Sequence, residues 1–158
     1  MPEKGGPPRR FLFVCTGNTC RSAMAEQLFL HEAGSGFQAR SAGVCARPGQ
    51  ESPPEAVAAL EKYGIDGTGH RSRDLSAADV DWADVILVMS KAHQTDVVLK
   101  YPRAVGKTRV LKTYVELPGD PHIPDPIGQT QEVYDYCAGI IHSCITELLK
   151  KIKPEESQ

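Results

Sequence analysis

The chain has 158 residues with a formal net charge of −2, and its 41% hydrophobic and 24% charged residues are typical of one soluble globular domain. This balanced charge argues against a nucleic-acid-binding protein or a polybasic membrane anchor, both of which normally carry an excess of basic residues. The sequence has no apolar run near the roughly 18 residues that a membrane span needs. Five cysteines are too few, and odd in number, for a disulfide scaffold, so we expect a reducing, cytoplasmic location.

The ends of the chain differ in composition from its interior. Residues 1–9 are rich in Pro and Gly and contain no core-forming residue, which predicts a flexible N-terminal tail. The apolar stretch 11–15 is too short for the apolar region of an export signal. We therefore expect one domain over 10–153, followed by a short C-terminal tail at 154–158.

Short apolar runs alternate along the domain with segments of helical periodicity. Ser22 is the expected N-cap of the first helix. This alternation predicts an α/β domain with a mostly parallel sheet, because parallel strands need crossover connections and helices provide them. Strands are expected at 10–14, 38–41, 84–89 and 109–111, and helices from Ser22 to about Gly34, from Pro53 to Gly64, from Lys91 to Lys100 and from Gln129 to Lys151.

The segment that carries the most chemistry is Cys15-Thr16-Gly17-Asn18-Thr19-Cys20-Arg21-Ser22, between the first strand and the first helix. Free backbone N–H groups at a helix N-terminus bind anions, and Gly17 and Asn18 both allow unusual backbone angles. The guanidinium of Arg21 can hold two oxygens of a phosphoryl group at once. The same positive field favours the thiolate of Cys15, which is its nucleophilic form. The segment thus predicts phosphoryl transfer through a covalent phosphocysteine.

The stretch FLFVCTGNTCRSAMAEQLF resembles the signature of the low-molecular-weight protein tyrosine phosphatase family. The resemblance covers roughly residues 10–150 and implies a single three-layer domain with a four-stranded parallel sheet, helices on both faces and a phosphate-binding loop after the first strand. It makes Cys15 the nucleophile and Arg21 the phosphate-binding residue. It also makes Asp125, within Ile123-Pro124-Asp125-Pro126, the general acid. One departure is Ala23, where the family usually has Pro; that proline is not required by the chemistry.

The resemblance also assigns supporting roles. It implies a hydrogen-bond network that holds the phosphate-binding loop, formed by Asn18, Ser22, Ser41 and His70. A turn serine and a surface histidine are the alternative interpretations of the last two residues. The loop itself comprises Thr16, Gly17, Asn18, Thr19, Cys20 and Ser22 beside the catalytic Cys15 and Arg21.

The implied mechanism has two steps and needs neither a metal ion nor a cofactor. The Cys15 thiolate attacks phosphorus while Asp125 protonates the leaving group, and the ionised Asp125 then activates the water that cleaves the phosphocysteine. The expected partners are phosphorylated protein substrates, with inorganic phosphate as product. We expect a monomer that binds neither nucleic acid nor a membrane.

Two positions bear on the choice of substrate. Tyrosine-directed members usually carry Ile or Leu where this chain has Thr19, and aromatic residues after the Asp-Pro pair, where this chain has Ile127. Both features resemble the bacterial protein-arginine phosphatase branch, so phosphoarginine is the expected substrate. The alternative is phosphotyrosine, with Thr19 as a packing residue and Tyr134 or Tyr136 as the aromatic wall.

Functions of other classes have weaker support. An arsenate reductase with this loop needs two further cysteines, but 90–95 contains none, and Cys137 and Cys144 would lie about 10 Å apart on one helix, where core packing is expected. The cysteines lack the paired spacing of a structural zinc site. Gly106-Lys107-Thr108 resembles the end of a nucleotide-binding loop, but Tyr101 replaces its first glycine. A non-catalytic phosphoprotein-binding module stays open.

Cys20 lies five residues after Cys15 in the same loop. A disulfide between the two would silence the enzyme on oxidation and protect Cys15 from irreversible oxidation. The alternative is that Cys20 only packs beneath the loop. The sequence suggests no role for Cys45.

Overall fold

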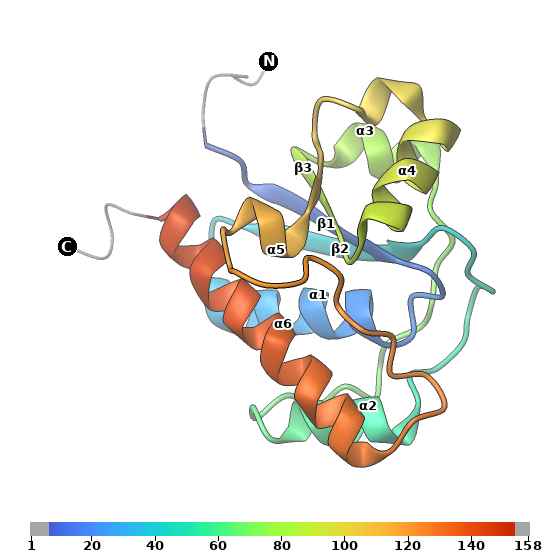
Figure 1. The fold of residues 1–158 in the computed structure, drawn as a ribbon, viewed down its shortest axis with the longest axis vertical. Helices are drawn as coiled ribbons and strands as arrows, with labels where there is room; N and C mark the ends of the chain where they lie inside the picture. The colour runs from blue at the N-terminus through green and yellow to red at the C-terminus, as the bar shows by residue number, and fades with distance from the viewer. Residues whose placement is uncertain (1–6, 154–158) are drawn as a thin grey trace.

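The computed structural model describes residues 7–153, which form an α/β domain (Figure 1). The expected tail residues 1–6 and 154–158 lie outside the described part. Arg9, at the end of the expected N-terminal tail, donates its backbone N–H to the Asp84 carboxylate (2.9 Å), and its carbonyl accepts from Gln38 (2.8 Å). The described backbone is therefore already tied to the sheet at Arg9.

The core of the domain is a four-stranded sheet with the order β2-β1-β3-β4, in which every pair is parallel. This confirms the expected fold class. The elements in chain order are β1 (Arg10–Cys15), α1 (Arg21–Ala33), β2 (Gln38–Gly43), α2 (Pro54–Glu61), α3 (Ala77–Trp82), β3 (Val85–Val88), α4 (Lys91–Lys100), the 3₁₀-helix η1 (Pro102–Ala104), β4 (Thr108–Val110), α5 (Leu111–Tyr114) and α6 (Gln131–Ile152).

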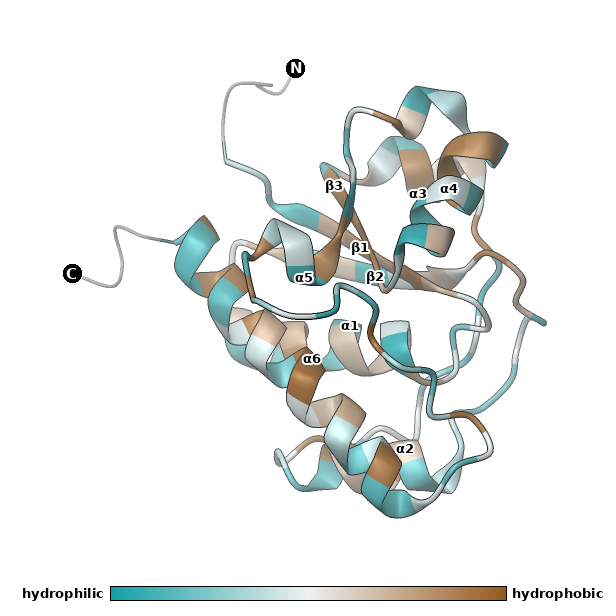
Figure 2. Cartoon of the chain, in the orientation of Figure 1, coloured by the Kyte–Doolittle hydropathy of each residue, from teal (hydrophilic) through white to brown (hydrophobic). Residues whose placement is uncertain are grey.

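Helices cover both faces of the sheet, so the two central strands are buried on both sides and apolar from Phe11 to Cys15 and from Val85 to Val88 (Figure 2). On β1, Phe11 and Phe13 belong to the apolar cluster shared with α1 and α6. Leu12 and Val14 point to the opposite face and belong to the cluster that includes residues of α3 and α4. The period of two along β1 thus joins both layers to one strand.

Two short helices, α3 and α5, were not expected from the sequence, because six and four residues are too few to show a helical period. A local signal for α3 does exist. Ser76 and Asp79 form a capping box in which each side chain accepts from the other residue's backbone N–H. The expectation that Ser22 caps the first helix is wrong, because α1 begins at Arg21 after Cys20.

The strand order reverses between β1 and β3, the two central strands. In open parallel sheets, ligands bind at the carboxyl ends of the strands beside such a reversal. The segment 15–22 follows β1 at this position, and the start of α4 follows β3 beside it. In the part of the chain that the structure describes, no helix is long and apolar enough to cross a membrane.

Candidate active site

A hollow of about 170 Å³ lies at the carboxyl end of β1. The chain folds two distant segments around it, the loop after β1 and the loop before α6. Seven consecutive residues of the first loop line it, together with two residues of the second. The lining residues are Cys15, Thr16, Gly17, Asn18, Thr19, Cys20, Arg21, Asp125 and Ile127.

The sulfur of Cys15 receives hydrogen bonds at the first turn of α1. The backbone N–H of Ser22 donates to Cys15 Sγ across 3.4 Å, and the Ser22 hydroxyl lies 2.9 Å from the same atom. Cys15 is only 2% exposed, so few other groups compete for its sulfur. The Ser22 hydroxyl therefore contacts the sulfur of Cys15 and does not cap the N-terminus of α1.

Asn18 is the centre of the hydrogen-bond network that supports the loop. Its side-chain amide donates to Ser22 Oγ (2.8 Å) and Ser41 Oγ (2.9 Å), and its side-chain oxygen accepts from the backbone N–H of Arg73 (2.8 Å). Its carbonyl oxygen lies 2.7 Å from His70 Nε2. The structure thus brings together all four residues expected in the network. It adds Arg73, whose backbone contribution has no sequence signal.

Two glycine positions explain how the loop fits against β2. Of the two loop residues that allow unusual backbone angles, Asn18 has the positive φ, 60°, and Gly17 does not. Gly43 is the glycine that the packing requires, since a Cβ there would lie 2.3 Å from the carbonyl oxygen of Thr16. Gly43 also pairs in register with Cys15. The end of β2 therefore supports the start of the loop from directly beside it.

Arg21 and Asp125 lie side by side in the hollow. Arg21 is 4% exposed and donates through Nη1 to the carbonyl of Ile123 (3.0 Å), while its Nη2 lies 3.5 Å from Asp125 Oδ2. Asp125 Oδ1 accepts from the backbone N–H of Ile127 (3.1 Å), and the side chain is 46% exposed. A buried guanidinium and an accessible carboxyl group therefore share one site.

A second contact with the loop comes from α4 and was missed by sequence reasoning. His93 Nε2 lies 2.8 Å from Thr16 Oγ1, and His93 Nδ1 lies 3.0 Å from Ser90 Oγ. Burial, and next the positive charge of Arg21, lower the pKa of His93 to about 4. Its imidazole is therefore neutral at pH 7. A single histidine far along the chain gives no sequence signal for this contact.

The aromatic candidates do not line the hollow. Tyr134 is 1% exposed, and its hydroxyl lies 3.7 Å from Cys20 Sγ. Tyr136 is exposed on α6, outside the lining of the hollow. Within residues 7–153, Thr19 and Ile127 are thus part of a lining that contains no aromatic side chain. Burial raises the pKa of both the Cys20 thiol and the Tyr134 phenol.

The two cysteines of α6 lie in the core. Both Cys137 and Cys144 are fully buried, and burial raises the pKa of Cys144 to about 12. The Cys137 thiol donates to the carbonyl of Pro124 (3.3 Å), next to the general-acid candidate. Both side chains belong to the apolar core cluster, which confirms the expectation that they pack there, and both thiols are free.

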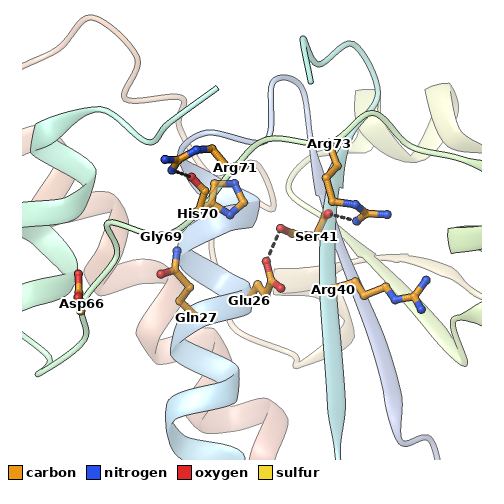
Figure 3. A pocket seen from close by; sticks show the side chains of 9 residues that line it. All are labelled: Glu26, Gln27, Arg40, Ser41, Asp66, Gly69, His70, Arg71 and Arg73. Carbon is orange, nitrogen blue, oxygen red and sulfur yellow. Dashed lines mark hydrogen bonds between the residues drawn. The ribbon is translucent and has the colours of Figure 1, made fainter. Parts of the chain in front are cut away.

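A larger cleft of about 510 Å³ lies behind the support network (Figure 3). Three partners of Asn18, namely Ser41, His70 and Arg73, line it. Its polar groups are already engaged within the protein: Ser41 donates to Glu26 (2.5 Å), and Arg73 donates to the Ser41 carbonyl (2.7 Å). We therefore interpret this cleft as the outer surface of the hydrogen-bond network that holds Asn18, and not as a second ligand site.

Fold and site together define a phosphatase built on a cysteine-containing anion-binding loop. The model of the family described as low molecular weight phosphotyrosine protein phosphatase matches residues 10–158. The chain belongs to this family and is a protein phosphatase, a hydrolase.

Three relatives show the range of the family. A protein-arginine-phosphatase of Geobacillus stearothermophilus is 39% identical over 149 residues, which cover 94% of this chain and 99% of the relative. The low molecular weight protein-tyrosine-phosphatase Ptp of Acinetobacter johnsonii is 34% identical, with coverages of 91% and 98%. The structure of a cysteine-to-serine mutant of YwlE arginine phosphatase, with a phosphorylated active-site serine, matches with a TM-score of 0.86, 35% identity and coverages of 91% and 95%.

Proposed function

We propose that this protein removes phosphate from phosphoarginine residues of proteins through a phosphocysteine on Cys15. The observation that carries the catalytic part is the position of the Cys15 sulfur. It accepts a hydrogen bond from the Ser22 backbone N–H and contacts the Ser22 hydroxyl, in a hollow that also holds Arg21 and Asp125. The mutant relative phosphorylated on its active-site serine supports a covalent intermediate.

In the first step the Cys15 thiolate attacks phosphorus and a P–S bond forms as the P–N bond of phosphoarginine breaks. The guanidinium of Arg21 and the backbone N–H groups of the loop bind the non-bridging oxygens. The departing guanidine nitrogen takes the proton of Asp125.

In the second step a water molecule attacks the phosphocysteine. Asp125, now a carboxylate, accepts a proton from this water as the P–S bond breaks. Inorganic phosphate leaves, and Cys15 returns to the thiolate. Each Asp125 proton that enters the leaving group is thus replaced from water, and the cycle closes without a metal ion.

The phosphoarginine assignment rests on the walls of the hollow. Stacking on an aromatic ring stabilises a bound phenyl group by roughly 0.5–1.5 kcal/mol beyond area burial, and the described lining offers no ring. Thr19 instead offers a hydroxyl, and Ile127 an exposed aliphatic side chain. A polar guanidinium on a flexible stem suits these walls better than a tyrosine ring does.

The test is release of phosphate from two matched peptides, one with phosphoarginine and one with phosphotyrosine at the same position. We expect a higher kcat/KM for the phosphoarginine peptide. Thr19→Ile is expected to lower the ratio of the two kcat/KM values, phosphoarginine over phosphotyrosine, by about tenfold, because it replaces a hydroxyl with an aliphatic side chain. A preference of the native protein for phosphotyrosine would contradict the assignment and favour the alternative substrate.

We further propose that oxidation joins Cys15 and Cys20. Peroxide oxidises the Cys15 thiolate to a sulfenic acid, and the Cys20 thiol then displaces water to form the disulfide. Burial raises the pKa of Cys20, so little of its reactive thiolate is present at neutral pH and the second step is slow.

We expect Cys20→Ser to recover less activity than the native protein after peroxide and then a thiol reductant. The measurement is the fraction of phosphatase activity regained, with mass spectrometry to detect the disulfide. Equal recovery in both proteins would mean that Cys20 only packs beneath the loop.

The cellular setting follows from the same chemistry. A catalytic thiolate with five free cysteines fits a reducing cytoplasm, which we propose as its compartment. Phosphorylated proteins are the proposed partners, and the monomer is the proposed active form.

A further inference from the structure

His93 is a buried polar side chain, and buried polar groups normally have hydrogen-bond partners. It lies in the first turn of α4, is 5% exposed, and has both ring nitrogens in hydrogen-bond contact. One contact, to Ser90, is local. The other, to Thr16, crosses from the end of β3 to the loop after β1.

The protons of this contact can be assigned by counting donors and acceptors. Ser90 Oγ accepts a hydrogen bond from the backbone N–H of His93 (3.2 Å). The Ser90 hydroxyl also contacts His93 Nδ1, which can accept its proton. A neutral imidazole has one N–H, and we assign it to Nε2 because Nδ1 can then accept the Ser90 hydroxyl proton. Nε2 then donates to Thr16 Oγ1, and the proton of the Thr16 hydroxyl stays available to another acceptor.

Thr16 directly follows the nucleophile and lines the hollow. We propose that its hydroxyl is an additional hydrogen-bond donor to the phosphoryl group of the substrate, with His93 as the positioning residue that turns this hydroxyl toward the site. The inference rests on the proposed function, because it takes the phosphoryl group to bind in this hollow. It assigns a role in phosphate binding to α4, on the opposite side of the loop from the Asn18 network.

The neutral state of His93 matters for this assignment. A protonated imidazole would donate from both nitrogens, so the Ser90 hydroxyl would lose its acceptor. The charged and titratable groups that act on His93 are Arg21, Asp96, His122 and Asp125. Burial lowers the pKa of His93 more than the Asp96 and Asp125 carboxylates raise it, so the imidazole stays neutral.

The experiment measures the inhibition constant of inorganic phosphate, with an aryl phosphate as substrate. Thr16→Val removes the hydroxyl and keeps the shape, and we expect it to raise this constant about tenfold, as the loss of one hydrogen bond to a charged group does. His93→Asn should have a similar effect, because its amide lies near the Nδ1 position. His93→Gln, whose amide nitrogen can replace Nε2, should restore most of the affinity.

A double variant, Thr16→Val with His93→Asn, distinguishes positioning from general support. If His93 acts through the Thr16 hydroxyl, the double variant should bind phosphate no more weakly than Thr16→Val alone. An unchanged phosphate inhibition constant in Thr16→Val would overturn the proposal. So would additive effects in the double variant, or tighter phosphate binding by His93→Asn than by His93→Gln. Thermal midpoints of all variants monitor folding.

A preference for phosphotyrosine would leave this test unchanged, but failure of the proposed phosphocysteine mechanism would look different. In that case the native protein would not hydrolyse the aryl phosphate. Phosphate affinity, measured then by calorimetry, would still depend on Thr16 and on the amide at position 93 if the inference is right. Phosphate affinity that is the same in the native protein and in Thr16→Val would overturn the inference whatever the turnover.

Discussion

Cys15→Ser is expected to lower kcat by about 10⁴-fold or more, because the hydroxyl that replaces the thiolate is not ionised at neutral pH and is a poor nucleophile. Neither the Ser22 backbone N–H nor the Ser22 hydroxyl, the two groups in contact with the sulfur, is a base that could activate the new hydroxyl. The measurement is phosphate release from an aryl phosphate and from the phosphoarginine peptide.

Phosphate binding provides the internal control for this variant. Arg21 and the loop N–H groups remain, so calorimetry should still detect inorganic phosphate bound to Cys15→Ser. Cys45→Ser is the matched cysteine replacement, since the Cys45 side chain is exposed and only its backbone contacts the loop. It should keep native turnover. Native turnover in Cys15→Ser would exclude the phosphocysteine mechanism.

The parts of this protein that could be predicted from the sequence are those whose information is local. The central strand β3 was predicted because a strand buried on both faces reads as a continuous apolar run, and Val85–Val88 is buried throughout. The phosphate-binding loop was predicted because nucleophile, anion-binding turn, arginine and helix start follow one another within 15–22. Helix α4 was predicted with its observed bounds, Lys91–Lys100.

The parts that were missed depend on contacts between distant segments. His93 contacts Thr16 because β1 and β3 pair, and no local sequence pattern specifies that pairing. The Arg73 contact with Asn18 is a backbone contact, for which any residue type would serve. Ser22 has the residue type of a helix cap, but the tertiary site uses its hydroxyl for the sulfur of Cys15. In each case the fold decides which of several possible partners a polar group finds.

Asp125→Asn is expected to lower kcat/KM by roughly 10²- to 10⁴-fold, because an amide cannot transfer a proton to the leaving group in the first step. The loss should depend on the leaving group: largest for the phosphoarginine peptide or an alkyl-like phosphate, and small for a nitrophenyl phosphate that departs without protonation. The measurement is kcat/KM across a series of aryl phosphates, in which the variant should show a steeper dependence on leaving-group basicity than the native protein.

This dependence separates two roles that Asp125 can play. Its carboxylate also lies 3.5 Å from Arg21 Nη2, so the amide weakens an ion pair that helps to place the phosphate-binding guanidinium. A loss of that kind would be the same for every leaving group, because the non-bridging oxygens do not change along the series. Asp120→Asn, an exposed change in the same loop, should leave the series unaltered. An equal loss across the series in Asp125→Asn would therefore contradict the general-acid role and assign Asp125 to the placement of Arg21.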